Sequence, residues 1–251
     1  MSCVNVRGCP IGEGRPKTIL PIVEGTEAAI LEKAAQFSTL PADCVEWRAD
    51  WFQECRDPAA VARCLQKLRV ALGSKLLLVT FRTQAEGGQA ALSPAEYRQF
   101  LELVLDTDCA DLLDIEFFTA GADLPLLVEQ AHTAGVPVVC SSHDFAKTPP
   151  RAELVERMVQ MQQAGADLPK LAVMPQSRID VLELLAATAE MADQHPETPV
   201  ITMSMGALGA VSRLAGETFG SAMTFANPGQ ASAPGQVSLE VVNEVLDALH
   251  L

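Results

Sequence analysis

Short apolar segments alternate with amphipathic segments along the whole chain. Eight segments are rich in apolar and β-branched residues and have the length of strands. They span residues 18–25, 43–50, 75–82, 111–118, 137–144, 167–175, 199–206 and 221–227. Apolar residues recur at helical spacing in the segments after them, at 26–37, 58–72, 93–106, 124–135, 150–165, 177–195, 206–220 and 238–251. The pattern predicts eight consecutive strand–helix units.

The spacing of these strands favours a closed barrel over an open sheet. Successive strands begin roughly 22 to 36 residues apart, which is the length of one strand with its crossover helix. Eight such units in 251 residues predict an α/β fold, a (β/α)8 TIM barrel forming a single domain over residues 1–251. We expect residues 1–17 to form a short N-terminal hairpin or strap. The small, polar, breaker-rich residues 227–236 predict a lid loop or a plain connector.

Charge and cysteine usage narrow the classes of function. The formal net charge is −14, which disfavours binding to nucleic acid or to an anionic membrane surface. The seven cysteines are scattered without a CxxC pair, so neither a disulfide framework nor a thiolate zinc site is expected. The chain shows no signal-peptide pattern and no apolar run of roughly 18 residues. We therefore expect a soluble cytoplasmic protein.

Side chains alternate between the lumen and the helix layer along each barrel strand. If the apolar residues face the helices, polar residues of five strands face the lumen. These are Glu46, Arg48, Asp50, Thr80, Arg82, Asp114, Glu116, Ser141, His143 and Lys170. Active sites of such barrels lie at the C-terminal ends of the strands, so this set predicts an active site.

Lys170 is the only one of the six lysines that lies inside an expected strand. A lysine among apolar groups and other cations has a depressed pKa, and its neutral amine can attack a carbonyl to form a Schiff base. The alternative is a structural lysine that pairs with Asp114 or Glu116. The sequence pattern around Lys170 leaves both interpretations open.

Three further residues could support such chemistry. His143 ends the strand before the one that carries Lys170, where an imidazole could take and return a proton, although a core histidine is an alternative. Glu86 lies just past the third strand and could orient that imidazole, or it could be a solvated loop residue. Arg213 could grip a carboxylate or lie exposed on its helix.

A metal site is the competing use of these carboxylates. Glu46, Asp50, Asp114, Glu116 and His143 include the ligand types that divalent cations prefer. Arg48, Arg82 and Lys170 would repel a cation in the same lumen, so we expect no metal.

Seven motifs give the chain a family resemblance. In order they are VEWRAD, TFRTQAEGG, SSHDF with the following KTP, PKLAVMP, ITMSMG, SRLAGE and QASAPGQ. They extend from the second strand to the loop after the eighth, and the chain resembles the type I 3-dehydroquinate dehydratases. The resemblance implies dehydration of 3-dehydroquinate to 3-dehydroshikimate through a lysine Schiff base. It also implies a homodimer without a metal or organic cofactor.

The resemblance assigns roles to individual residues. It implies that Lys170 forms the Schiff base, that His143 is the general acid and base, and that Glu86 partners His143. The residues implied to bind substrate are Glu46, Arg48, Arg82, Arg213, Ser232 and Gln236, the last two in the lid. Three alternatives remain open: a Schiff-base aldolase, a non-catalytic sensor of a cyclohexane carboxylate, and a metal-dependent isomerase.

Overall fold

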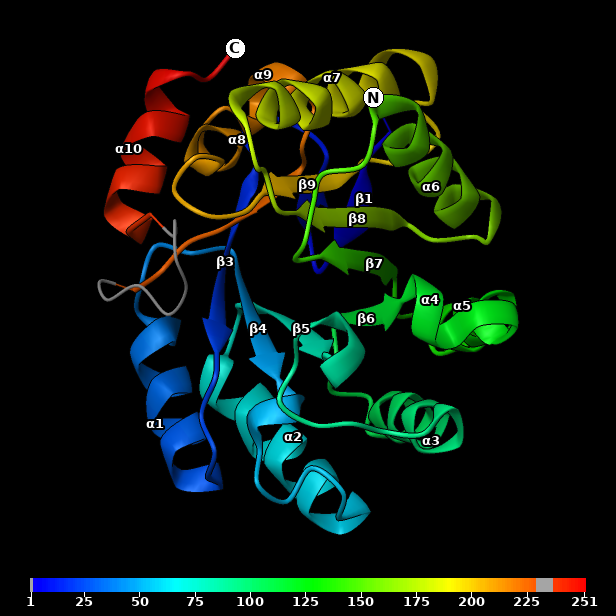
Figure 1. Ribbon diagram of the computed structural model, residues 1–251. Helices are drawn as coiled ribbons and strands as arrows, with labels where there is room; N and C mark the ends of the chain where they lie inside the picture. The colour runs from blue at the N-terminus through cyan, green and yellow to red at the C-terminus, as the bar shows by residue number, and fades with distance from the viewer. Residues whose placement is uncertain (1, 229–236) are drawn as a thin grey trace.

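The computed structural model describes residues 2–228 and 237–251, and Figure 1 shows strands surrounded by helices. Eight parallel strands form one sheet in the order β10-β3-β4-β5-β6-β7-β8-β9. They are β3 (Lys17–Ile22), β4 (Cys44–Arg48), β5 (Leu76–Thr80), β6 (Leu112–Glu116), β7 (Val138–Asp144), β8 (Leu168–Val173), β9 (Ile201–Ser204) and β10 (Met223–Phe225). A bridge between Val200 and Ser221 brings the β9 and β10 ends together. The barrel is therefore nearly closed, and the predicted (β/α)8 fold is confirmed.

Helices cover the outside of the barrel (Figure 1). The longer ones are α1 (Glu27–Ser38), α2 (Pro58–Leu72), α3 (Pro94–Asp106), α5 (Leu124–Thr133), α6 (Arg151–Gln163), α7 (Arg178–Gln194) and α10 (Leu239–Ala248). Ser93 and Ser177 begin α3 and α7 with capping boxes, which satisfy backbone N–H groups of the first turn. No helix in the two described ranges has the length and apolar character needed to cross a membrane.

Two segments differ from the expected elements. The expected helix at 206–220 is two short helices, α8 (Ala210–Leu214) and α9 (Gly216–Phe219). Its backbone packs closely on the barrel, because a Cβ at Gly209 would lie 2.3 Å from the carbonyl oxygen of Ser204. The strand expected to reach residue 118 ends at Glu116, and α4 (Phe117–Ala120) and the 3₁₀ turn η3 (Gly121–Asp123) follow it. Both changes occur at the barrel rim, where the chain turns away from the strands.

The N-terminal hairpin is present and closes the bottom of the barrel. Strand β1 (Val4–Val6) pairs antiparallel with β2 (Cys9–Ile11). Arg7 and Gly8 both have positive φ, as a tight two-residue hairpin turn requires. Val6 and Ile11 join the apolar cluster that fills the lower lumen. Polar side chains in the lumen are therefore accessible from the C-terminal ends of the strands.

Strand alternation divides the core into two apolar clusters. Trp47, Phe81 and Leu171 belong to the cluster between the strands and the helices, whereas Leu78 and Ala172 belong to the lumen cluster. Each set occupies the face that its sequence parity predicts. The same parity directs the polar residues of these strands into the lumen.

Candidate active site

A cavity of about 400 Å³ opens at the C-terminal ends of the strands. Its charged and titratable lining comes from β4, β7, β8, the segment after β5, and α8, namely Glu46, Arg48, Arg82, His143, Lys170 and Arg213. Its wall is apolar at Val23, Trp51, Phe145, Met203, Met205 and Phe225. The cavity thus combines an apolar body with a few convergent polar groups, which is typical of a small-molecule site.

Lys170 is the third residue of β8 and is 2% exposed. Its Nζ donates a hydrogen bond of 3.1 Å to Oδ2 of Asp114 and lies 3.8 Å from Oε1 of Glu46. Nζ also lies 4.8 Å from the centre of the Phe225 ring, at a distance suited to a cation–π contact. The buried ammonium is therefore paired, and its nitrogen still borders the cavity.

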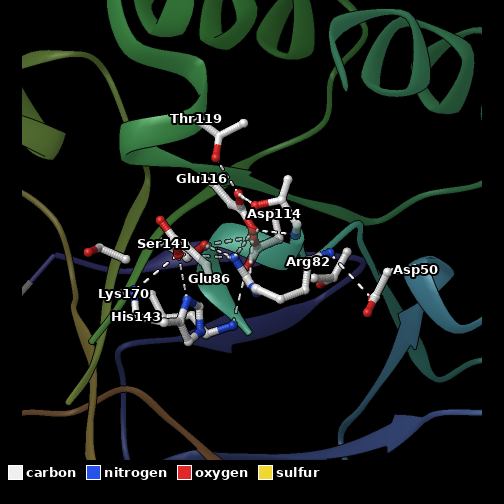
Figure 2. Close-up of polar contacts among 12 residues, drawn as sticks. Asp50, Arg82, Glu86, Asp114, Glu116, Thr119, Ser141, His143 and Lys170 are labelled. Carbon is white, nitrogen blue, oxygen red and sulfur yellow. Dashed lines mark hydrogen bonds and ion pairs between the residues drawn. The ribbon is translucent and has the colours of Figure 1, made fainter. Parts of the chain in front are cut away.

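A buried network fixes Asp114, the partner of Lys170. The guanidinium of Arg82 donates hydrogen bonds of 2.8 and 2.9 Å to Asp114 and Glu116 (Figure 2). Ser141 accepts a third bond from Arg82 and donates one of 2.6 Å to Oδ1 of Asp114. Burial opposes the charge of Arg82, but the carboxylates of Asp114 and Glu116 raise its pKa. Arg82 therefore stays cationic and holds the carboxylates in place.

His143 and Glu86 form a hydrogen-bonded pair at the cavity (Figure 2). The distance from Nδ1 of His143 to Oε2 of Glu86 is 2.8 Å, and the backbone N–H of His143 donates to the same oxygen at 3.1 Å. Because Oε2 acts as an acceptor toward this backbone group, we assign the imidazole proton to Nδ1. The lone pair then lies on Nε2, where it can accept a proton from a ligand.

Burial shapes the titration of both partners. It raises the pKa of Glu86 to about 8, against the opposing charge of Arg82. Burial and the positive charges of Arg82, Lys170 and Arg48 lower the pKa of His143 well below its ordinary value of 6.5. Both shifts favour the neutral forms. At pH 7 the imidazole is therefore a free base, held by a largely protonated carboxyl group.

The loop that carries Glu86 is clamped to the barrel. Glu86 ends the 3₁₀ turn η2 (Gln84–Glu86), whose preceding residue, Thr83, donates from its backbone N and its Oγ1 to Glu116 at 2.8 and 2.7 Å. The backbone N–H of Gly88 donates to the carbonyl oxygen of Thr83 at 2.8 Å. The reach of Glu86 toward His143 is thus set by a tight, buried turn.

We expect Gly88→Ala to damage this turn. A Cβ at Gly88 would lie 1.8 Å from the carbonyl oxygen of Arg82, so the loop must shift. Overpacking of this kind costs about 1–3 kcal/mol, and the displaced Glu86 would release His143. The free energy of unfolding and kcat should both fall. Gly25→Ala is the matched control, because its Cβ would meet only the flexible end of Gln53, at 3.3 Å. Wild-type values for Gly88→Ala would contradict the expectation.

Arg213 is a buried cation on α8 that also lines the cavity. It is 7% exposed, and burial lowers its pKa. No carboxylate among the described residues lies within ion-pair distance of its guanidinium, and its Nε has no hydrogen-bond partner among them. Its NH1 contacts Sδ of Met203 at 3.7 Å. A buried guanidinium in this state is a ready site for an anionic group.

Two other expected residues are held by short polar contacts. Arg48 forms a bidentate pair with Asp50, at 2.7 and 2.8 Å, and Asp50 also accepts the backbone N–H of Gln89 at 3.0 Å. Asp50 lies in the 3₁₀ turn η1 (Ala49–Trp51), just beyond β4. Oε1 of Glu46 accepts a hydrogen bond of 2.9 Å from Thr80. Both Arg48 and Glu46 still line the cavity.

Comparisons with known proteins agree with this geometry. The family model for type I 3-dehydroquinase matches residues 18–251. The 3-dehydroquinate dehydratase of Bacillus licheniformis is 47% identical over 98% of this chain and 97% of its own length.

The chain belongs to the type I 3-dehydroquinase family.

Solved structures of the family superpose on this chain over nearly its whole length. The type I 3-dehydroquinate dehydratase of Clostridium difficile, solved with covalently modified comenic acid, has a TM-score of 0.96 at 42% identity and covers 99% of this chain and 97% of its own. The enzyme of Geobacillus kaustophilus has a TM-score of 0.95 at 38% identity, with 99% and 96% coverage. This family member therefore has the family's barrel.

In this family member, the structure brings together most of the site residues that the sequence predicts. Lys170, His143, Glu46, Arg48, Arg82 and Arg213 border one cavity, and Glu86 contacts His143 behind it. Ser232 and Gln236 lie outside the described residues, as does most of the expected lid at 227–236. The two alternatives from the sequence, a metal site and a purely structural Lys170, involve side chains of this same group. Of the two carboxylates suggested as partners for Lys170, Asp114 makes the contact, and Glu116 instead binds Arg82 and Thr83.

Sequence reasoning missed the apolar wall of the cavity. Met203 and Phe225 are lumen-facing residues of β9 and β10, so strand parity could have found them. Phe145 follows β7 and stacks on His143 with 6.4 Å between ring centres. It also lies against Gly87, whose positive φ and missing Cβ admit the ring. Nothing in the local pattern around Phe145 indicated this contact.

Proposed function

We propose that this chain catalyses the dehydration of 3-dehydroquinate to 3-dehydroshikimate and water through an imine on Lys170. The proposal rests on the side chains that surround the cavity of this family member. The cavity is bordered by Lys170, by the neutral imidazole of His143, and by Arg213, which has no carboxylate partner among the described residues. One small ligand in this cavity could therefore form an imine, exchange a proton with a base and have its carboxylate bound.

The first step forms the imine. The amine of Lys170 adds to the C3 ketone, and the ketone oxygen leaves as water to give a protonated C=N bond. Lys170 attacks as its amine, because an ammonium has no lone pair to donate to the carbonyl carbon. The protonated imine then withdraws electrons from C2, and this makes the C2 hydrogen more acidic.

The second step is elimination, in which His143 acts as both base and acid. Its free Nε2 takes the C2 proton, and the electron pair forms an enamine. The imidazolium returns the proton to the departing C1 hydroxyl, which leaves as water. Glu86 keeps the ring in orientation through the 2.8 Å contact with Nδ1. Hydrolysis of the product imine then restores the amine of Lys170. A base of this kind contributes about 10²–10⁴-fold to the rate.

Substrate recognition is assigned to the remaining polar residues. Arg213 binds the ring carboxylate, and Glu46, Arg48 and Arg82 contact the ring hydroxyls and the pocket wall. Ser232 and Gln236 close over the ligand from the lid, which would exclude bulk water during elimination. Support for the role of Arg213 comes from its burial and its lack of a carboxylate partner among residues 2–228 and 237–251.

One experiment tests the proposed function directly. The purified chain is incubated with 3-dehydroquinate, and formation of the conjugated enone of 3-dehydroshikimate is followed by ultraviolet absorbance. Borohydride is then added during turnover, and the reduced adduct is located by peptide mass. We expect enone formation and an adduct on Lys170. An adduct on another residue, or turnover that borohydride leaves intact, argues against the mechanism.

Loss of the Arg213 charge should weaken substrate binding. Hydrogen bonds to charged groups contribute about 1.5–3 kcal/mol, so Arg213→Ala is expected to raise KM roughly 10- to 150-fold, whereas Arg213→Lys should recover part of this loss. Arg151→Ala, an exposed arginine on α6, is the control. Steady-state kinetics on 3-dehydroquinate measures the change. An unchanged KM in Arg213→Ala would assign the carboxylate to another residue.

We further propose that the enzyme works as a homodimer in the cytoplasm. The family resemblance supports the dimer. All seven cysteines are free in the structure, which suits a reducing compartment. Sedimentation equilibrium of the purified chain tests the oligomeric state.

A further inference from the structure

Asp114 is aimed at the nitrogen of Lys170 by an unusually complete set of contacts. It is fully buried on β6. Its Oδ1 accepts hydrogen bonds from Arg82 and Ser141, at 2.8 and 2.6 Å. These anchors leave Oδ2 for Nζ of Lys170, at 3.1 Å (Figure 2). A carboxylate fixed through one oxygen and presented through the other is positioned before any ligand arrives.

The charge of the lysine nitrogen is the same before and after imine formation. An ammonium and a ketone give a protonated imine and one water, because two nitrogen-bound protons leave with the ketone oxygen. The site therefore holds one positive charge on this nitrogen in both states. A buried unpaired charge costs several kcal/mol, so without a counter-ion the imine would lose its proton. A neutral imine is a poor electron sink.

We propose that Asp114 is the counter-ion of the protonated imine on Lys170 and keeps that imine in its electron-withdrawing form. The inference rests on the proposed function. Asp114 makes its contact at hydrogen-bond distance, whereas Glu46 lies 3.8 Å away and already accepts a hydrogen bond from Thr80. The iminium nitrogen carries one N–H, which can satisfy a single close acceptor, and Oδ2 of Asp114 holds that position.

The ionisation of Asp114 itself is secured by its neighbours. Burial opposes its negative charge, but Arg82 and Lys170 outweigh the burial and lower its pKa below the ordinary value. Arg82 also stays bound to Glu116, so the anchor does not depend on the lysine. Asp114 contacts the atom that becomes the imine nitrogen, and in this role it is a catalytic residue.

The test reads the protonation of the imine rather than the rate alone. Enzyme with lysine labelled by ¹⁵N at Nζ is saturated with 3-dehydroshikimate, which can form the product imine without further elimination. The ¹⁵N chemical shift distinguishes protonated from neutral imine, and it is followed against pH. We expect Asp114→Asn to lower the apparent pKa of the imine by about 1–3, the range for loss of one opposite charge, and to lower kcat. Asp247→Asn makes the same change of charge at an exposed carboxylate that pairs with Arg15 away from the cavity, so its imine should titrate as in the wild type.

The outcomes separate this inference from the proposed function. A wild-type enzyme that forms no imine, by the ¹⁵N signal and by borohydride trapping, overturns the proposed function and this inference with it. If the imine of Asp114→Asn is as protonated as that of the wild type, the counter-ion role of Asp114 is overturned but the proposed function is not. The same holds if Glu46→Gln, and not Asp114→Asn, loses the imine proton. If Asp114→Asn does not fold, the wild type still decides. The pKa of its imine must be higher than that of the imine which the same ketone forms with butylamine in solution. An equal or lower pKa rejects the counter-ion role of Asp114.

Discussion

Replacing Lys170 with alanine is expected to lower kcat at least about 10⁴-fold, because covalent catalysis is lost together with the electron sink. The C2 proton must then be removed beside an ordinary ketone. The fold should persist, since Asp114 keeps its hydrogen bonds to Arg82 and Ser141. The measurement is enone formation from 3-dehydroquinate, with circular dichroism to check folding.

Lys33→Ala is the matched control for this change. Lys33 lies on α1 and forms a 3.9 Å ion pair with Glu24, with about a third of its side chain exposed. Its replacement removes one ammonium without touching the cavity, so turnover and borohydride labelling should stay at wild-type levels. More than a hundredth of wild-type turnover in Lys170→Ala would show that the imine is dispensable.

His143→Ala is expected to separate imine formation from elimination. The pKa of His143 lies well below 6.5, so at pH 7 the imidazole is already the base that removes the C2 proton. Its loss should reduce kcat about 10²–10⁴-fold, the usual contribution of a general acid and base. Lys170 and Asp114 remain, and the substrate imine should still form. Borohydride should then trap an adduct on Lys170 heavier by one water than the product adduct.

The adduct mass makes this second prediction specific. His132→Ala serves as the control, because His132 lies on α5, is 43% exposed and pairs with Asp167. This variant should turn over normally. If His143→Ala yields the product adduct at the wild-type rate, another group removes the proton. If it yields no adduct, His143 acts before elimination, in forming the imine.

The barrel could be predicted from the sequence because its signals are local. Apolar residues recur with a period of two residues in each strand and of 3.6 residues in each helix. Ser93 and Ser177 cap their helices as their patterns indicate. Parity then places Lys170 and His143 in one lumen. The segment 206–220 was predicted less well, since its helical period competes with close packing of Gly209 on Ser204. Contacts with a distant strand decided that segment.

The site was predictable in its members but not in its pairings. From the sequence, Asp114 and Glu116 were equal candidates to pair with Lys170, and the side-chain contacts inside the folded barrel decided between them. Ser141 lies opposite Lys170 on β8 and opposite Glu116 on β6. Although Glu116 is therefore level with Lys170, Asp114 is the carboxylate that lies 3.1 Å from Nζ, and Glu116 binds Thr83 at the start of the loop of Glu86. A difference of two residues along one strand separates these roles.

By itself, the sequence determined the eight-unit barrel, the polar residues of its lumen, the unusual strand position of Lys170 and the motifs of its family. These features depend on backbone periodicity and residue type, which neighbouring residues along the chain already specify. The folded barrel was needed to show that Asp114 faces Lys170, that Glu86 reaches His143 and that Arg213 lies buried without a carboxylate partner among the described residues. Those facts depend on distances between side chains far apart in sequence, and closing the barrel is what sets them.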